Sequence, residues 1–187
     1  MTPVTLLIRP LMTEEEAVRW ATPEELACVA TFGTEQRRRE FLSWRAVVRE
    51  ALGNDVMIAY NELGAPVLCG RAEHLSVSHA GDCVVVALAD RPIGVDIERM
   101  DRNFERVKGK YLTANELAIS CDSRFLAVAW CAKEAVYKRY GIRELTFEEV
   151  QLTNFTGDRI IACVRGGDPV ELIVQYLDTE FVLVYCL

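Results

Sequence analysis

The amino-acid sequence predicts an α+β fold built from two similar halves, each a long helix followed by a meander of antiparallel strands. Apolar residues recur at helical spacing in two stretches, one from Glu35 and one from Ser123, and both stretches end at a glycine. Short strand-like runs follow each stretch. We therefore expect an N-terminal half over residues 1–91 and a C-terminal half over residues 92–187, joined near residues 90–93.

The helix of the first half is predicted over EQRRREFLSWRAVVREALG. Phe41, Leu42, Val48 and Leu52 have helical apolar spacing there, and Gly53 is suited to a helix end. Four short apolar runs after it are predicted strands: VMIAY, PVL, LSVS and CVVVALA. The residues DRP then mark a turn.

The helix of the second half is predicted over SRFLAVAWCAKEAVYKRYG and ends at Gly141. Its upstream part is apolar on all sides, which indicates burial on more than one face, and Tyr137 is expected on the core side. The charged residues Lys133, Glu134 and Lys138 are then expected where the helix leaves the core, at a cleft. The predicted strands that follow are EVQLT, RIIACV, VELIVQYL and FVLVYCL.

Composition and charge narrow the class of protein. The 187 residues are 51% hydrophobic and 26% charged, which is typical of a soluble globular protein, and a net charge of -7 argues against nucleic acid as a partner. Seven cysteines without a C-x-x-C pair indicate neither a disulfide framework nor a zinc site. No apolar run is long enough to span a membrane or to serve as a signal peptide, so we expect a reduced, cytoplasmic protein with no membrane partner.

The stretch RPIGVDIER contains two acids that a strand would place on the same face, Asp96 and Glu98. Neighbouring carboxylates repel each other unless a positive charge lies between them, and Mg²⁺ commonly uses one or two protein carboxylates together with substrate phosphate. Taken alone, the pattern is better explained as the solvated face of an edge strand.

Glu134 and Lys138 lie four residues apart on the second predicted helix. An exposed pair of this kind stabilises a helix by about 0.2–0.5 kcal/mol, and that is the simpler explanation. The apolar sequence before the pair favours a position at a cleft instead. Glu134 could there complete a magnesium site begun by Asp96 and Glu98.

The stretch LSVSHAGD ends a predicted strand at Ser78 and His79 and continues into a turn of small residues. A hydroxyl, an imidazole and open backbone amides at such a turn can bind a phosphate. A plain hairpin with a polar tip is the better explanation when the stretch is taken alone. A serine-hydrolase dyad is disfavoured because neighbouring residues on a strand point to opposite faces.

Four motifs, in this order, resemble those of a known family: LSVSHAG, PIGVDIE, YLTANE and WCAKEAVYK. Together they closely resemble the 4′-phosphopantetheinyl transferases, in particular the larger, pseudo-dimeric type that serves fatty-acid, peptide and polyketide carriers. The resemblance covers residues 35–150 at the level of motifs. It implies two α+β halves related by a pseudo-twofold axis, with the coenzyme A site in the cleft between them.

The resemblance also implies a reaction. Members of the family move the phosphopantetheine arm of coenzyme A to a serine of an apo acyl or peptidyl carrier protein and release adenosine 3′,5′-bisphosphate. We therefore expect a Mg²⁺-dependent holo-[acyl-carrier-protein] synthase with coenzyme A as its co-substrate. A fused pair of halves removes the need for an intersubunit site and favours a monomer.

The same resemblance assigns roles to residues of this chain. Asp96, Glu98 and Glu134 correspond to the magnesium ligands. Glu134 is also the expected base for the carrier serine, and Lys138 is expected to steady or protonate the leaving group. The expected contacts to coenzyme A are basic and polar side chains from both halves: Arg38, Arg39, Arg45, Ser78, His79 and Lys133. The role of Glu116, as ligand, base or helix cap, stays open.

One departure from the family pattern lies at Gly64-Ala65-Pro66, where the family often has a basic residue before the proline. Loss of a charged hydrogen bond to phosphate would weaken binding by about 1.5–3 kcal/mol, which Arg71 or Lys133 could offset. A catalytically weak or inactive relative that binds coenzyme A or a carrier is therefore the alternative. A structural α+β domain with surface carboxylates is a more remote one.

Carrier proteins are usually acidic, so net charge cannot attract one to this acidic chain. A local basic segment could dock an acidic carrier helix instead, and it contains Arg102, Arg106, Lys108 and Lys110. An ordinary solvated basic loop is an equally good explanation, because exposed charges contribute little.

Overall fold

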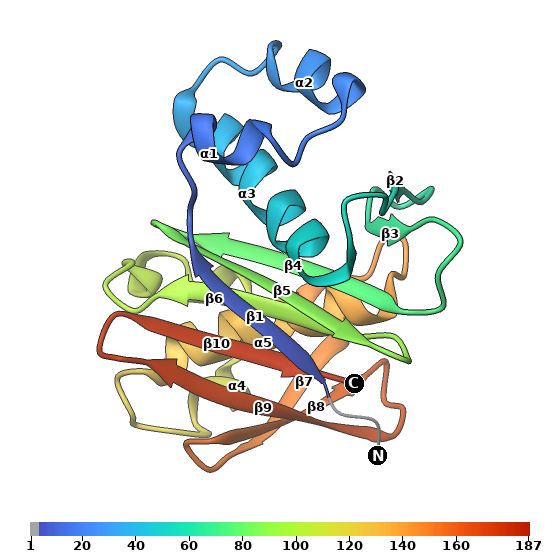
Figure 1. Cartoon of the computed structure of the whole chain (residues 1–187). Helices are drawn as coiled ribbons and strands as arrows, with labels where there is room; N and C mark the ends of the chain where they lie inside the picture. Colours follow the sequence, from blue (N-terminus) through green and yellow to red (C-terminus); the bar gives the residue numbers. More distant parts are fainter. Residues whose placement is uncertain (1–3) are drawn as a thin grey trace. The chain divides into compact units, whose positions relative to one another are not determined.

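The computed structural model describes residues 4–187. They form two compact units, of which the first ends at Asp90 and the second runs from Arg91 to Leu187 (Figure 1). Each unit combines helices with antiparallel strands, so the α+β class predicted from the sequence is confirmed. In the part of the chain that the structure describes, no helix is both long and apolar enough to cross a membrane.

The first unit has a three-stranded antiparallel sheet in the order β1-β5-β4. Its strands are β1 (Thr5–Pro10), β4 (His74–Ala80) and β5 (Cys83–Ala89). A separate hairpin consists of β2 (Ile58–Tyr60) and β3 (Pro66–Leu68), and β3 contacts β4. The helices are α1 (Glu14–Val18), α2 (Pro23–Val29) and α3 (Glu35–Leu52).

Helix α3 is the predicted helix of the first half. It begins after Thr34, whose hydroxyl accepts a hydrogen bond from the Arg37 amide. It ends at Gly53, whose φ of 111° is strained for any residue with a side chain. Its apolar face buries Trp44 and Val48 in the core beside strand β5. This helix prediction is confirmed.

Helices α1 and α2 lie outside the predicted elements. Each begins with a capping box, formed by Thr13 with Glu16 and by Thr22 with Glu25. In each box the threonine hydroxyl accepts from the glutamate amide, and the glutamate carboxylate accepts from the threonine amide. Both short helices pack on α3. The threonine-to-glutamate spacing was the sequence signal for them.

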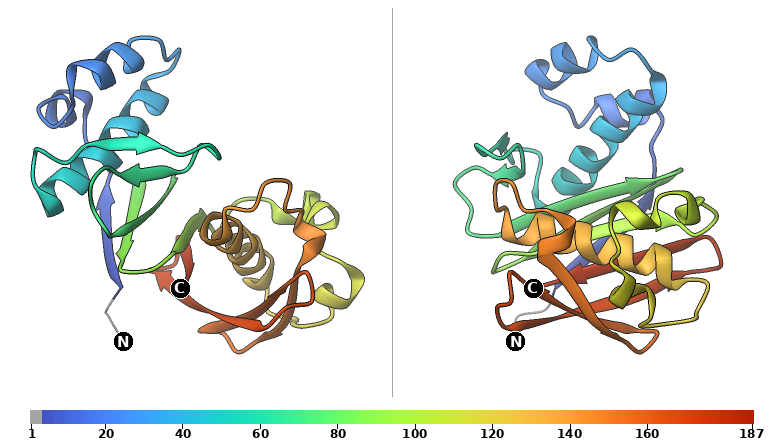
Figure 2. Two further views of the ribbon diagram at one scale, coloured as in Figure 1. Left: turned by 90° about the vertical axis from the view of Figure 1, so that its right-hand side faces the viewer. Right: turned by 180° about the vertical axis from the view of Figure 1, so that it is seen from behind.

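The second unit has a five-stranded antiparallel sheet in the order β6-β10-β9-β8-β7, and Figure 2 shows this sheet curving around helix α5. Its strands are β6 (Gly94–Arg99), β7 (Val150–Phe155), β8 (Arg159–Val164), β9 (Pro169–Leu177) and β10 (Phe181–Cys186). The α-helices are α4 (Ala114–Leu117) and α5 (Phe125–Tyr140). Three short 3-10 segments are η1 (Phe104–Arg106), η2 (Lys108–Lys110) and η3 (Phe147–Glu149).

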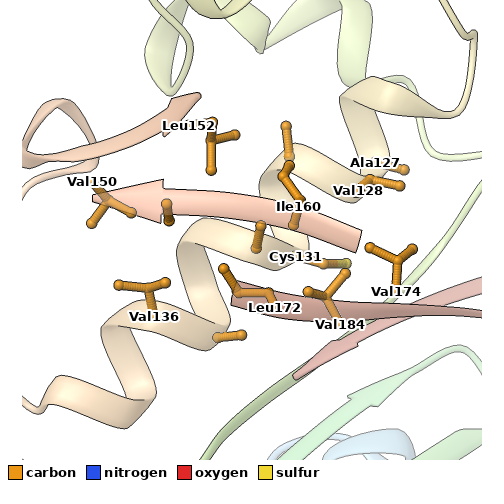
Figure 3. Packing of buried hydrophobic residues seen from close by; sticks show 14 of the residues in the cluster. Ala127, Val128, Cys131, Val136, Val150, Leu152, Ile160, Leu172, Val174 and Val184 are labelled. Atoms are coloured by element: carbon orange, nitrogen blue, oxygen red, sulfur yellow. The ribbon is translucent and has the colours of Figure 1, made fainter. Parts of the chain in front are cut away.

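Helix α5 is the centre of the core of the second unit. Val128, Cys131 and Val136 are fully buried and pack with strand residues such as Leu172 and Val184 (Figure 3). The helix contacts strands β6, β7, β8 and β10 as well as η1. The prediction that this helix is buried on more than one face is therefore confirmed.

Tyr137 corrects one detail of that prediction. Its side chain was expected on the core side, but the residue is 45% exposed. The run of fully buried residues on α5 ends one position earlier, at Val136, and the helix itself ends at Gly141 in the left-handed conformation with φ 54°. The last turn of α5 thus leaves the core sooner than the apolar pattern indicates.

The two units share a connectivity. In each, the first strand pairs with the last, and the last pairs with the strand before it, which gives β1-β5-β4 and β6-β10-β9. In the chain order of each unit, the long helix follows the first strand and precedes the other strands. The order of elements is thus similar in the two units, while the two-half organisation inferred from the sequence stays a prediction. The pseudo-twofold axis, the cleft and the division into domains at residues 91 and 92 stay predictions.

Candidate active site

Strand β6 and helix α5 approach each other closely at Gly94. A Cβ atom added there would lie 1.8 Å from the Ala135 carbonyl oxygen, so only glycine fits beneath the helix. Because side chains alternate along a strand, Asp96 and Glu98 lie on the same face of β6 as Gly94. The sequence of this strand therefore brings both acids to the side that faces α5.

Two cations neutralise the acids of β6. Lys138, in the last turn of α5, places its Nζ 2.7 Å from Asp96 Oδ1 and donates to the Val95 carbonyl oxygen at 3.0 Å. Arg102 pairs with Glu98 and also stacks over the Trp130 ring, 4.7 Å from its centroid. Each acid of this strand thus has a counterion supplied by the protein.

Glu134 lies one turn before Lys138 on α5. Partial burial raises the pKa of its carboxyl, and the charge of Asp96 acts in the same direction, while Lys138 and Arg102 oppose both. Burial also raises the pKa of the Glu98 carboxyl, against the effect of Arg102 and with a further contribution from Asp96. Asp96 therefore acts on both glutamates, and the three acids share one electrostatic environment, which we call the carboxylate cluster.

The donors of the carboxylate cluster are of the kind that Mg²⁺ prefers, and one or two carboxylates suffice when water and phosphate supply the other ligands. Across residues 4–187, no three Asp, Glu, His or Cys side chains are arranged to hold a metal ion by themselves. Lys138 and Arg102 hold two of the acids instead. The residues therefore fit magnesium by donor type.

A pocket of about 600 Å³ lies beside Glu134. Its lining comes entirely from the second unit: Lys110, Glu134, Tyr137, Leu145, Thr146, Phe147 and Glu148. Apolar and aromatic side chains on this wall stand next to a carboxyl whose pKa is raised, a combination typical of binding and catalytic sites. The exposure of Tyr137 is explained by its place in the pocket wall.

Lys133 does not reach this pocket. It is fully buried, its Nζ lies 2.7 Å from Glu116 Oε1, and it donates to the Phe147 carbonyl oxygen at 2.8 Å. The structure therefore does not support the predicted contact between Lys133 and coenzyme A. Among the roles left open for Glu116, the structure shows that of a helix cap, because Glu116 forms a capping box with Thr113 at the start of α4.

The three arginines predicted to bind coenzyme A lie on α3 in the first unit. They differ in how far their side chains are buried and in their partners within the protein. Arg38 pairs with Glu14 at 2.8 Å, and Arg39 donates to the backbone carbonyls of Met12 and Leu11. Arg45 is only 2% exposed. Its guanidinium donates to three groups of the protein: Glu25, the Phe41 carbonyl and the Tyr60 hydroxyl. The structure assigns Arg45 to the interior, so its predicted contact with phosphate is not supported.

Ser78 and His79 point to opposite faces of β4, as the alternation of a strand requires. Ser78 is 7% exposed, whereas the His79 side chain is 41% exposed. His79 Nδ1 lies 3.4 Å from Glu40 Oε1 on α3, a partner that the sequence did not indicate. Of the two, only His79 presents its side chain to solvent.

The basic segment predicted to dock a carrier is interrupted by acids. Lys108 pairs with Glu105 at 2.6 Å, and Arg102 is held by Glu98. Arg102 and Lys108 line a second cavity of about 660 Å³, whereas Lys110 lines the pocket beside Glu134. Arg102 is thus the partner of an acid of the carboxylate cluster, although the sequence predicted it in a docking segment; its position four residues after Glu98 was a signal for the pair.

The profile of the 4′-phosphopantetheinyl transferase superfamily (ACPS) matches residues 92–186, just over half of the 187 residues. The chain belongs to this superfamily. The matched range contains the carboxylate cluster, Lys138 and the pocket, and it lies within the second unit. No curated protein matches the chain. Membership supports a transferase, and members of the superfamily generally use Mg²⁺ and coenzyme A.

Proposed function

We propose that the protein is a Mg²⁺-dependent 4′-phosphopantetheinyl transferase of the larger, pseudo-dimeric type, which modifies a serine of an apo acyl or peptidyl carrier protein. The observation that carries the proposal is the carboxylate cluster of Asp96, Glu98 and Glu134, which lies inside the range matched by the superfamily and adjoins a pocket at Glu134. A cytoplasmic location and a monomeric state remain predictions from the sequence.

In the proposed reaction, the oxygen of the carrier serine forms a bond to the phosphorus that bears the pantetheine. The bond from this phosphorus to the bridging oxygen of coenzyme A breaks, and adenosine 3′,5′-bisphosphate leaves. The serine proton passes to the Glu134 carboxylate or to a water that it holds. A base positioned at this site contributes about 10²–10⁴-fold to the rate.

Lys138 supplies positive charge at the same place. Its side chain is 27% exposed, and its Nζ lies 2.7 Å from Asp96 Oδ1, so the ammonium can turn from this carboxylate toward a phosphate that enters the site. There it would steady or protonate the leaving group. Mg²⁺, held by Asp96, Glu98 and Glu134, would polarise the pyrophosphate and neutralise its developing charge.

Further contacts to coenzyme A rest on the family resemblance alone. Among the residues predicted for this role, Arg38, Arg39 and His79 remain candidates because their side chains are not enclosed in the interior. Ser78 is a weaker candidate since it is 7% exposed.

Ala65 supports the alternative, a weak or inactive relative that binds coenzyme A or a carrier. It lies in the turn between β2 and β3, where its amide donates to the Asn61 side chain at 3.0 Å, and its methyl group cannot pair with phosphate. Calorimetry distinguishes the two readings, because binding of coenzyme A without transfer under any metal supports the alternative.

A carrier panel tests the proposed activity directly. Purified protein, Mg²⁺, coenzyme A and a set of apo acyl and peptidyl carriers should yield at least one carrier whose mass increases by one phosphopantetheine. Glu134→Gln should abolish this change, whereas Glu171→Gln should not, because Glu171 lies on β9 in an exposed pair with Arg159. Tight binding of coenzyme A by the wild type without modification of any carrier would refute the activity.

A further inference from the structure

The second unit buries an ion pair that the proposed reaction does not use. Glu116 is 3% exposed, Lys133 is fully buried, and their charged atoms lie 2.7 Å apart. Glu116 Oε1 also accepts from the Leu152 amide at 2.9 Å, and Oε2 accepts from the amide and hydroxyl of Thr113 at 2.8 and 2.9 Å. Both carboxylate oxygens are therefore occupied by groups of the protein.

Lys133 connects this pair to the pocket. Its ammonium donates to the Phe147 carbonyl oxygen at 2.8 Å, and Phe147 lines the pocket beside Glu134. The Phe147 ring also packs on Trp130, with 5.5 Å between the ring centroids. Lys133 and Glu134 are consecutive on α5, so their side chains leave the helix about 100° apart, one toward the interior and the other toward the pocket.

We propose that Glu116 and Lys133 form a positioning pair that holds the segment Leu145–Glu148 as the wall of the pocket beside Glu134. The pair joins four elements, because Glu116 belongs to α4 and contacts β7, while Lys133 belongs to α5 and contacts η3. The inference rests on the proposed function, since it concerns the shape of the pocket next to the proposed base.

The energetics of buried charge favour this role over a purely stabilising one. Burying two charges costs desolvation energy that their attraction often fails to recover, and apolar replacements of a complete pair are frequently neutral. What such a pair supplies is a fixed geometry, here through hydrogen bonds to the backbone at Phe147 and Leu152. A role as metal ligand or base would require an oxygen of Glu116 that faces the pocket, and both oxygens are engaged elsewhere.

The first test compares two buried cations. Lys133→Met keeps most of the side-chain volume but removes the ammonium. Arg49→Met is the matched control in the first unit, because Arg49 is 2% exposed and donates to the Glu25 carboxylate and to the Trp20 carbonyl, both at 2.7 Å. Transfer kinetics are measured per folded molecule, together with amide hydrogen exchange.

We expect Lys133→Met to lower kcat/KM for coenzyme A about tenfold or more, because displacement of a pocket wall misplaces the reactants. Exchange should accelerate in residues 145–152, where the anchored backbone lies. Arg49→Met should lower the melting temperature yet leave kcat/KM per folded molecule within about twofold of the wild type. Wild-type kcat/KM in Lys133→Met would overturn the proposal.

The second test uses Glu116 and keeps the proposal falsifiable if Lys133→Met fails to fold. Glu116→Gln retains an oxygen that accepts from Lys133 and Leu152, so it should keep clearly more activity than Glu116→Ala. A base or metal ligand would instead lose activity equally in both variants, and that result would overturn the proposal. If the proposed function is wrong, the wild type itself transfers no phosphopantetheine, and this inference is refuted with it. If only the inference is wrong, the wild type is active and the variants deviate from the activities expected here.

Discussion

Glu116 and Glu134 lie in the same unit and are both withdrawn from water, yet their surroundings shift the pKa values of the two carboxyls in opposite directions. At Glu116, burial acts to raise the pKa, but hydrogen bonds from the Leu152 amide, Lys133 and the Thr113 amide outweigh it and bring the pKa below its ordinary value. At Glu134, burial raises the pKa and Asp96 adds to the effect.

The difference separates two uses of buried charge. The protein satisfies the Glu116 carboxylate completely, so this region fixes structure. It leaves the carboxylate cluster with more negative charge than its environment favours, and such unfavourable arrangements are frequent at functional sites. A divalent cation would reduce the repulsion within the cluster, whereas the Glu116 carboxylate already has its partners within the protein.

The largest expected effect is on the free energy of unfolding, and it compares Lys133, the partner of Glu116, with Lys138, the partner of Asp96. Lys133→Met leaves Glu116 buried without its partner and should cost about 3–5 kcal/mol in the free energy of unfolding. Lys138→Met should cost about 1–2 kcal/mol, because Lys138 is 27% exposed and water can replace part of its contact with Asp96. Urea unfolding measures both values, and a larger loss for Lys138→Met would contradict the comparison.

A smaller loss is expected when the support of the carboxylate cluster is changed at Gly94. Gly94→Ala forces its new methyl group against the Ala135 carbonyl oxygen, so α5 must shift away from β6 at a cost of about 2–3 kcal/mol. Gly109→Ala is the control, because a Cβ atom there meets nothing within 4 Å. Equal unfolding midpoints for the two variants in urea would show that the close approach of β6 to α5 at Gly94 does not contribute to stability.

The pH dependence of stability should distinguish Glu116 from an ordinary surface acid. Because its folded pKa is lowered, Glu116 contributes stability that is fully present above the unfolded value, about 4.5, and is lost as pH falls through the folded pKa. The difference in unfolding free energy between wild type and Glu116→Gln should therefore be largest near neutral pH and shrink in acid. A difference that is constant from neutral pH into the acid range would contradict the assignment.

The smallest expected effect is that of Glu134 on stability, and its pH dependence is opposite in sign to that of Glu116. Because the folded pKa of Glu134 is raised, its ionisation destabilises the native state, and this penalty grows as pH rises from the unfolded value through the folded pKa. Glu134→Gln removes the penalty and should raise the melting temperature slightly at neutral pH, but not below the unfolded pKa. A lower melting temperature at neutral pH would mean that the carboxylate supports the fold.

Much of the fold could be predicted from local patterns. Apolar spacing and the terminal glycines indicated both long helices, and short apolar runs indicated the strands that follow them. Strand β1 and helices α1 and α2 were outside the prediction, although capping boxes marked the two helices. Short elements carry too few apolar residues for a clear period.

The candidate site was harder to predict, since its decisive contacts join distant residues. Asp96 and Lys138 are 42 positions apart, and Leu152 lies 36 positions from Glu116. Motifs predicted Asp96, Glu98 and Glu134 as magnesium ligands, but they could not reveal that Lys133 points inward while Glu134 lines the pocket. That assignment depends on the rotation of α5 about its axis.

We propose that Glu134 belongs to a transfer site and that Glu116 does not. Mass spectrometry of one apo carrier, treated in parallel with wild type, Glu134→Gln and Glu116→Gln in the presence of Mg²⁺ and coenzyme A, tests it most directly. We expect phosphopantetheine on the carrier with wild type and, more slowly, with Glu116→Gln, and none with Glu134→Gln. Modification by Glu134→Gln at the wild-type rate would contradict it.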